Sequence, residues 1–200
     1  MVKFGIIGTG VISYKFANAL KAVPGTSIVA VMDINRAASE KFAGEYGVTK
    51  IYDTVEEFVK DPEVQVVYIA TINPTHYELT KACLNAGKHV YCEKPFVMQK
   101  DQAVELIELA KSKGLFLCEN LWTKYLPIYD KVRSLISIGE IGEVRMIHCN
   151  YYFPADFDPK GRLFDKEKGG WHIWYNGRKG APEYIGEAFM EGTFTEDDFE

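Results

Sequence analysis

Lys94 places an ammonium group, which can exchange a proton once it is partly desolvated, directly after an apolar segment of strand length. It lies in the stretch HVYCEKPFVM, residues 89–98, where strand-like apolar residues are followed by Glu93, Lys94 and Pro95. Charged groups beside a buried strand lose solvation, and a proline stiffens the backbone that follows them. Two interpretations follow: a surface ion pair before a proline turn, or side chains that serve a site at the end of the strand.

A glycine motif lies near the start of the chain. In GIIGTGVIS, Gly8, Gly10 and Ser13 occupy the positions of a G-x-G-x-x-G/A fingerprint, with serine in third place. Gly8 permits a tight turn, Gly10 lets a pyrophosphate approach the backbone, and a small third residue allows close packing. The amides of Val11 and Ile12 then begin a helix whose N-terminus attracts phosphates. Ordinary turn chemistry is the alternative for glycines after a strand.

Asp33 strengthens the dinucleotide interpretation. It ends the second apolar stretch, 23 residues after Gly10, where an acidic side chain accepts hydrogen bonds from ribose hydroxyls. Its charge would repel a 2′-phosphate, which favours NAD, whereas Arg36 would attract that phosphate and keeps NADP open. The alternative for Asp33 is a cap of the next helix.

The order of elements predicts where these side chains lie. Apolar segments of strand length, at residues 2–8, 27–33, 50–53, 64–71, 88–93 and 115–119, alternate with segments of helical period. Strands so uniformly apolar are buried on both faces, which indicates an α/β fold with a doubly wound parallel sheet. We expect this dinucleotide-binding domain at residues 1–120. Residues 121–200 then form an incomplete second α/β region, with a helix near 125–142 and an alternating strand at 144–153.

Composition excludes several classes of partner. The chain has 200 residues, 47% hydrophobic and 26% charged, and its net charge of -5 gives no reason to expect nucleic acid or an anionic membrane. No apolar run approaches membrane-spanning length. The four cysteines are too widely spaced for a zinc site or a disulfide framework, so we expect no metal, free and mostly buried thiols, and a cytoplasmic protein.

Several stretches together resemble the Gfo/Idh/MocA oxidoreductases, a family that includes glucose–fructose oxidoreductase and inositol dehydrogenases. They are FGIIGTGVIS, AVMDIN, YIATINPTHYE, AGKHVYCEKPF and ENLWTKYLP, within residues 2–153. The resemblance implies a Rossmann domain followed by an α/β domain that covers the cofactor and mediates oligomerisation. It also implies hydride transfer between NAD(P) and a hydroxyl carbon of a sugar-like or cyclic alcohol.

The resemblance gives roles to the residues around Lys94. Lys94 is implied to act as the catalytic acid/base, or to hold the substrate oxygen, because a cationic nicotinamide nearby weakens its hold on the proton. Glu93 is implied to orient the lysine or to touch the nicotinamide ribose. Pro95 fixes the turn, with a possible cis Lys94–Pro95 bond.

In a doubly wound sheet, ligands collect at the carboxyl ends of the strands, so we expect residues after the neighbouring strands to share the edge where Lys94 lies and to complete the site. Thr71 and Asn73 are implied to contact the cofactor through backbone and small polar groups, and His76 to lie near it. The alternative for His76 is a polar residue at a helix start. Asn120 and Trp122 are expected in the substrate pocket, although Trp122 fits an interdomain core nearly as well.

The chain departs from the family after DKEKGG. Relatives continue with an Asp and a His that complete the catalytic group, and no matching pair follows Gly170 here. A short relative, a fragment and a shifted reading frame each explain this tail. The alternative function is therefore a dinucleotide-binding protein without turnover. Exposed apolar residues are expected to drive homo-oligomerisation through the region after residue 140.

Overall fold

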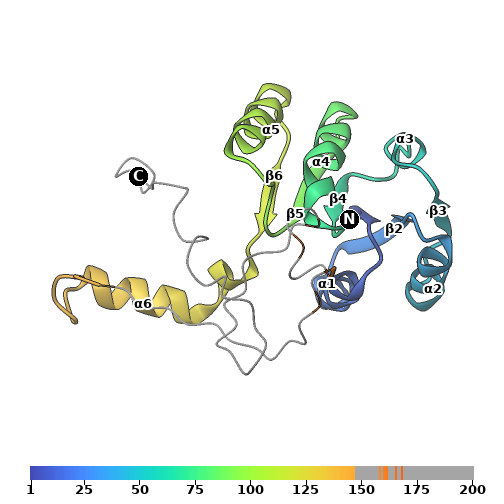
Figure 1. Cartoon of the computed structure of the whole chain (residues 1–200). Helices are drawn as coiled ribbons and strands as arrows, with labels where there is room; N and C mark the ends of the chain where they lie inside the picture. The colour runs from blue at the N-terminus through green and yellow to red at the C-terminus, as the bar shows by residue number, and fades with distance from the viewer. Residues whose placement is uncertain (147–157, 159, 162–164, 166–167, 169–200) are drawn as a thin grey trace. The chain divides into compact units, whose positions relative to one another are not determined.

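Six parallel strands form the centre of the fold, in the order β3-β2-β1-β4-β5-β6 (Figure 1). They are β1 Val2–Ile7, β2 Thr26–Met32, β3 Lys50–Tyr52, β4 Val66–Ile69, β5 His89–Glu93 and β6 Leu117–Asn120. The strand order runs outward from β1 in both directions, which confirms the predicted doubly wound sheet. The computed structural model describes residues 1–146, 158, 160, 161, 165 and 168.

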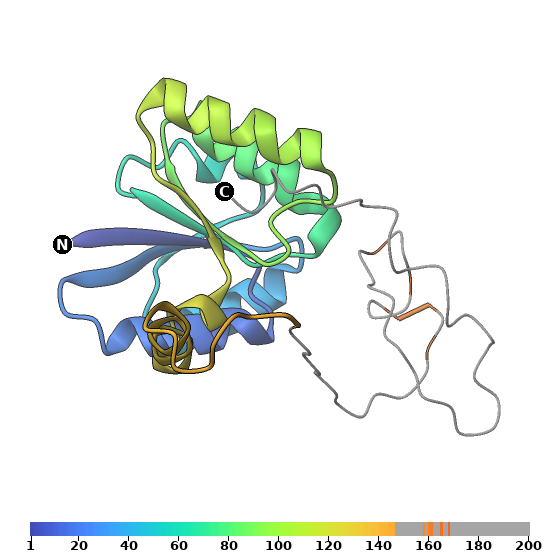
Figure 2. The ribbon, with the colours of Figure 1, turned by 90° about the vertical axis from the view of Figure 1, so that its left-hand side faces the viewer.

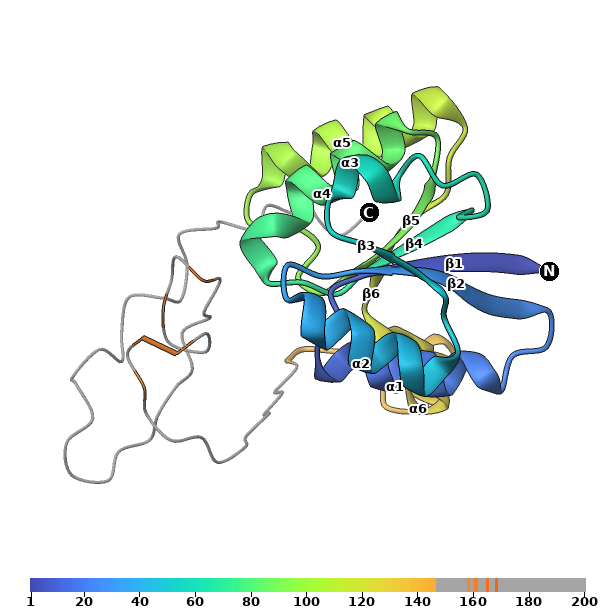
Figure 3. The same ribbon diagram turned by 90° about the vertical axis from the view of Figure 1, so that its right-hand side faces the viewer.

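Helices cover both faces of this sheet. α1 and α2 lie on one face, and α3, α4 and α5 lie on the other (Figures 2 and 3). They are α1 Val11–Lys21, α2 Arg36–Tyr46, α3 Val55–Phe58, α4 His76–Asn85 and α5 Lys100–Lys113, with a short 3-10 helix η1 at Asn73–Thr75. Among the described helices, none has both the length and the apolar composition needed to cross a bilayer.

Each central strand contributes to two hydrophobic cores. Ile7 and Val67 pack beneath α3, α4 and α5, whereas Ile6 and Tyr68 pack on the side of α1 and α2. All four side chains are at most 1% exposed. Because neighbouring residues of a strand point to opposite faces, a strand buried on both sides must be apolar at successive positions. This requirement explains why the sequence pattern identified the sheet.

Three of the four cysteines lie among the described residues, and all three are free thiols, of which two are buried. Cys83 and Cys92 are free and buried, and burial raises the pKa of each thiol to about 12. Cys118 is also free but only partly buried. Cys149 lies outside the described residues.

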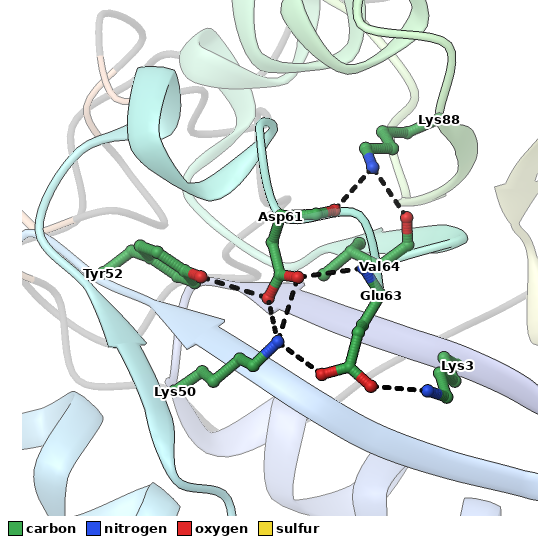
Figure 4. A network of polar contacts seen from close by, with 7 residues as sticks. All are labelled: Lys3, Lys50, Tyr52, Asp61, Glu63, Val64 and Lys88. Atoms are coloured by element: carbon green, nitrogen blue, oxygen red, sulfur yellow. Dashed lines mark hydrogen bonds and ion pairs between the residues drawn. The ribbon is translucent and has the colours of Figure 1, made fainter.

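Asp61 joins three strands at the amino edge of the sheet (Figure 4). Its side chain is 1% exposed. Its carboxylate accepts hydrogen bonds from the Lys50 ammonium at 3.0 and 3.1 Å, the Tyr52 hydroxyl at 3.1 Å and the Glu63 amide at 2.9 Å. Its carbonyl oxygen accepts another from Lys88 Nζ at 2.7 Å. The network thus ties β3 and the loop before β4 to the start of β5.

The carboxylates of this network make folding sensitive to acid. Burial alone would raise the pKa of Asp61, but hydrogen bonds from Glu63, Lys50 and Tyr52 outweigh it and lower that pKa. Hydrogen bonds from Lys3 and Lys50 lower the pKa of Glu63 from 4.5 to about 2. A carboxyl with a lowered folded-state pKa stabilises the fold above its unfolded value and loses this contribution as pH falls through the folded value. Stability should therefore decline between about pH 4.5 and about pH 2.

Asp61→Asn is expected to lower the free energy of unfolding at neutral pH by about 2 kcal/mol, because a charge-assisted network loses its buried anion. It should also flatten the acid decline, which urea unfolding at neutral pH and near pH 3 measures. Asp130→Asn is the matched control, since that side chain is 74% exposed and its ion pair is with the exposed Arg133 in the next turn of the same helix. An acid decline in the Asp61→Asn chain as steep as in the wild type would contradict this role.

Beyond β6 the chain forms the 3-10 helix η2, Trp122–Tyr125, and α6, Pro127–Ser137. No residue of α6 is buried, and Ile128, Val132 and Ile136 are 60%, 43% and 39% exposed. Of the strand predicted at 144–153, residues 144–146 are not in a strand, and the remainder lies outside the described residues. The domain boundary between residues 120 and 121 remains a prediction.

Contacts between residues group Met1–Tyr152 into one unit and Phe153–Glu200 into a second. In the second unit, the ammonium of Lys168 lies 3.3 Å from the carboxylate of Asp165. The Gly161 amide donates to the Asp158 carbonyl oxygen at 2.9 Å, which forms a local turn.

Candidate functional site

The parallel register brings the ends of five strands to one edge of the sheet. Ile7 of β1 pairs with both Met32 of β2 and Ile69 of β4. Cys92 of β5 pairs with Ile69, and Glu93 pairs with Asn120 of β6. The residues that follow these ends therefore lie along the same edge, as we expected from the sequence, and they include Gly8, Asp33, Thr71, Lys94 and Trp122.

Gly8 occupies a place that only glycine fills without strain. Its φ is +91°, and a Cβ there would lie 2.7 Å from the carbonyl oxygen of Ala70. Its amide donates to the Met32 carbonyl oxygen at 2.8 Å. Ser13 is fully buried, and its Oγ donates to the Gly8 carbonyl oxygen at 2.6 Å. The serine in the third position of the motif thus both packs closely and holds the turn.

Gly10 has no comparable structural reason to be glycine. Its φ of -75° and ψ of -176° are open to any residue, and a Cβ there would meet nothing within 4 Å. It precedes α1, whose first turn carries no acidic side chain and whose start has no side-chain cap. The amides of Val11 and Ile12 have no acceptor inside the helix, so they are available to an anion. The local geometry fits a dinucleotide phosphate.

Asp33 braces the glycine turn. Its Oδ2 accepts hydrogen bonds from the Thr9 amide at 2.6 Å and the Thr9 hydroxyl at 3.1 Å, and its Oδ1 accepts one from the Asn35 amide at 2.8 Å. The side chain that caps α2 is Asn35, which accepts from the Ala38 amide at 3.2 Å. Asp33 is therefore not the helix cap, and Oδ1 keeps acceptor capacity for a hydroxyl group.

Arg36 is engaged by two carboxylates. Its Nε lies 3.0 Å from Glu40 Oε1, and its Nη1 lies 2.9 Å from Asp53 Oδ1. Hydrogen bonds to Asp53 and Glu40 raise the pKa of Arg36. All three side chains are more than 40% exposed. A phosphate that approaches Arg36 therefore meets a guanidinium already neutralised by its neighbours.

Glu93 is buried and does not pair with the ammonium of Lys94. It is 6% exposed, and its Oε1 accepts hydrogen bonds from the Tyr68 hydroxyl and Asn120 Nδ2, each at 2.6 Å. Asn120 Oδ1 accepts from the Tyr91 hydroxyl at 2.7 Å. Burial, followed by the bond to Glu93, raises the pKa of Tyr68 well above its usual range, so this hydroxyl stays a donor. A surface ion pair is therefore not the arrangement that forms.

Lys94 is exposed on a turn whose backbone is held in place. In the described part of the chain its ammonium has no ion pair, whereas its amide donates to Glu93 Oε2 at 3.3 Å. The Lys94–Pro95 bond is cis, as the resemblance implied. The Phe96 amide donates to Glu119 Oε1 at 2.8 Å. The site thus presents one unpaired amine on an anchored turn.

The turn after β4 carries the other predicted residues. The Thr71 and Thr75 hydroxyls lie 2.6 Å apart, and Asn73 is 7% exposed. His76 is 0% exposed, with Nδ1 2.8 Å from the Pro95 carbonyl oxygen and Nε2 3.3 Å from the Thr71 carbonyl oxygen. His76 is therefore not merely a polar residue at a helix start. It connects the turns that follow β4 and β5.

The two residues expected in the substrate pocket differ in placement. The Asn120 side chain bonds to Glu93 and Tyr91, so both ends of its amide are used beneath the Lys94 turn. Trp122 is 53% exposed. Its assignment to the pocket remains a prediction.

Sequence reasoning missed four residues at this edge. Thr9 and Tyr68 are the partners of Asp33 and Glu93, and their spacing along the chain gives no sign of these bonds. Ile34 and Ile72 follow β2 and β4 and are 96% and 44% exposed. An exposed apolar residue directly after a strand of this sheet edge is a signal that could have been used.

Metal ligands do not gather in the described ranges. Across residues 1–146 and the five described residues beyond them, no three His, Cys, Asp or Glu side chains come together as a possible metal site.

Relatives with known names cover most of this chain. It is 37% identical over 170 residues to the trans-1,2-dihydrobenzene-1,2-diol dehydrogenase of Xenopus laevis, and 34% identical over 173 residues to that of Mus musculus. Each match covers 84% of this chain and 51% of the relative. The chain therefore spans about half the length of these curated relatives.

Solved structures of relatives also match most of this chain but less than half of their own length. KijD10, a 3-ketoreductase from Actinomadura kijaniata in complex with NADP and TDP-benzene, is 29% identical with a TM-score of 0.68, over 72% of this chain and 44% of that one. Biliverdin reductase from Synechocystis sp. PCC 6803, in complex with biliverdin and NADP+, is 31% identical with a TM-score of 0.63, over 71% and 44%.

The family match coincides with the sheet and its carboxyl edge. Residues 2–121 match a family described as an oxidoreductase family with an NAD-binding Rossmann fold. This range contains the glycine turn and Asp33, whose local geometry fits a dinucleotide, and it also contains the Lys94 turn. The chain is a member of the Gfo/Idh/MocA oxidoreductase family.

Proposed function

We propose that this chain binds NAD(P) at the carboxyl edge of the sheet and transfers hydride between it and a hydroxyl carbon of a sugar-like or cyclic alcohol. The observation that carries the proposal is an exposed amine without an ion pair among the described residues, on the same sheet edge as the glycine turn. Ligands of open α/β sheets bind at this edge. An amine there can exchange a proton with a bound alcohol.

Different residues of the chain would bind the cofactor, transfer the proton and support the turn that carries Lys94. The amides of Val11 and Ile12, beside Gly10, would hold the phosphates, and the remaining acceptor capacity of Asp33 would bind a ribose hydroxyl. Bound NAD(P) supplies the hydride acceptor in oxidation and the hydride donor in reduction. Lys94 takes the hydroxyl proton in one direction and returns it in the other. Glu93 supports the turn that carries Lys94, through its hydrogen bond with the Lys94 amide.

The family and the names of relatives support the proposed substrate class. The Xenopus and mouse relatives are named for a cyclic diol, and KijD10 is a 3-ketoreductase. Both names describe chemistry at a carbon that carries a hydroxyl or keto oxygen. We therefore propose a cyclic alcohol with neighbouring hydroxyl groups as the first substrate to test, and a reducing cytoplasm as the compartment.

Cofactor binding and turnover are tested separately. NADH and NADPH fluorescence titrations measure binding, and a dehydrogenase screen over dihydrodiols, sugars and cyclitols measures turnover. Binding with turnover supports the proposal. Binding without turnover selects the second function, a dinucleotide-binding protein, which the unmatched Asp and His of the family favour. No binding of either nucleotide would reject both functions.

NAD is the proposed cofactor, with NADP as the alternative that the named structures bind. Asp53→Asn is expected to raise the affinity for NADPH about two- to fivefold, because Arg36 loses one of its two exposed partners and exposed ion pairs hold their charges only weakly. The affinity for NADH should not change. Fluorescence titration of both nucleotides measures the ratio, and Arg36→Ala is expected to abolish the gain. Equal changes for the two nucleotides would contradict this role.

Self-association is proposed through the region after residue 140. Ile141, Val144 and Met146 are 60%, 40% and 86% exposed, and the rest of this region, from residue 147, lies largely outside the described residues. Contiguous exposed apolar surface drives association. Light scattering of the full chain tests this, and a strictly monomeric protein would contradict it.

A further inference from the structure

His76 joins the turn that carries Lys94 to the turn after β4. Its ring is 0% exposed, and its two nitrogens lie 2.8 Å from the Pro95 carbonyl oxygen and 3.3 Å from the Thr71 carbonyl oxygen. A carbonyl oxygen only accepts, so the shorter contact requires a proton on Nδ1. We propose that His76 is a positioning residue that sets the place of the Lys94 amine through Pro95.

The Lys94 turn has few other hydrogen bonds to the described part of the domain. The Lys94 amide bonds to the adjacent Glu93 at 3.3 Å, the Phe96 amide bonds to Glu119 of β6 at 2.8 Å, and Cys92 Sγ lies 3.8 Å from the Phe96 carbonyl oxygen. Pro95 has no amide hydrogen, so its carbonyl oxygen is the group through which this residue can be tied by a hydrogen bond. The bond to His76 thus links this turn to α4.

The ring has no nitrogen left for a ligand. Both nitrogens face main-chain carbonyl oxygens, and no part of the ring reaches the surface. The Thr71 carbonyl belongs to the turn after β4, and the Pro95 carbonyl belongs to the turn after β5. His76 therefore acts on the site through these turns, and this role rests on the proposed function of Lys94.

Three substitutions separate the two contacts. Asparagine can place its amide nitrogen near the position of Nδ1, glutamine can place its nitrogen near Nε2, and leucine supplies neither donor. His76→Asn is expected to keep kcat within about threefold of the wild type. His76→Gln and His76→Leu should lower kcat about tenfold or more, with little change in the NADH dissociation constant, because a displaced amine misses the reacting oxygen.

Two measurements on the chain without cofactor test the contact itself. Nitrogen-15 NMR of the wild type should show His76 protonated on Nδ1, and hydrogen exchange of the segment 93–99 should be faster in His76→Leu and His76→Gln than in His76→Asn. Exchange of β4 should remain native in all three chains, which shows that they are folded. A proton on Nε2 alone, or native exchange of segment 93–99 in His76→Leu, would overturn the proposal.

Failure of this inference is distinguishable from failure of the proposed function. A wild-type chain that binds neither NADH nor NADPH would remove the proposed function, while the tautomer and the exchange rates would still decide whether His76 holds the turn. A wild-type chain that turns over, with His76→Leu and His76→Asn equal in kcat, would remove only the positioning role.

Discussion

Lys94→Met is expected to bind NADH as tightly as the wild type and to lose turnover by a factor on the order of 10²–10⁴. Lys94 is exposed, so methionine replaces it without burying a new group, and it keeps an unbranched stem but has no proton to exchange. The fold and the glycine turn should be unaffected. Fluorescence titration measures binding, and steady-state kinetics with the alcohol found in the substrate screen measures turnover.

Two further variants define what the amine does. Lys94→Arg keeps the positive charge but cannot release its proton near neutral pH, so it should be as slow as Lys94→Met if proton transfer is the role. A Lys94→Arg chain with high activity would instead indicate that the charge only holds the substrate oxygen. Lys113→Met, in the last turn of α5, removes an exposed lysine elsewhere and should change nothing. Turnover of Lys94→Met within threefold of the wild type would contradict a catalytic role.

The strands, and their burial on both faces of the sheet, could be predicted because they depend on the local pattern of apolar residues. Ile6 and Ile7 of β1, or Val67 and Tyr68 of β4, are apolar in succession because helices pack on both faces of the sheet. Right-handed connections between parallel strands then leave few arrangements. Because such a sheet gathers its carboxyl ends, the sequence also predicted that the glycine turn and Lys94 share an edge.

The partners of the charged groups could not be predicted, because they come from distant parts of the chain. Glu93 bonds to Tyr68 and Asn120, which lie 25 and 27 residues away. Periodicity tells which face of a strand is buried, but it does not tell which buried polar groups meet. For that reason the sequence allowed an ion pair between Glu93 and Lys94, whereas the structure buries the carboxylate under neutral donors and leaves the amine exposed.

The same limit applies to Asp33 and His76. Sequence spacing placed Asp33 at a ribose, and its hydrogen bonds to Thr9 show that it also holds the glycine turn. His76 was expected near the cofactor, and its contacts with the carbonyl oxygens of Pro95 and Thr71 emerge only from the packed turns. The residues that follow the carboxyl ends of the strands were thus predictable, whereas the hydrogen bonds that hold these residues in place were not.

Substitution by alanine should change the stability of the fold at one glycine of the fingerprint and leave it unchanged at the other. Gly8→Ala is expected to lower the free energy of unfolding by on the order of 3 kcal/mol, because φ is +91° and the new Cβ would lie 2.7 Å from a backbone oxygen of Ala70. Gly10→Ala should unfold like the wild type, since its φ of -75° suits alanine and nothing lies within 4 Å of the new Cβ. Urea unfolding measures both.

Nucleotide binding should depend on Gly10 even though stability does not. Gly10→Ala is expected to weaken NADH binding about tenfold or more, because the methyl group takes the space through which a phosphate reaches the amides of Val11 and Ile12. The glycine that the fold does not need is then the one that the ligand needs. The urea unfolding of Gly10→Ala is the control for its binding measurement: if this chain is as stable as the wild type, a loss of binding cannot come from unfolding. Wild-type NADH affinity in the Gly10→Ala chain would mean that the space beside Gly10 is not a phosphate site, and the helix start would lose its assigned ligand.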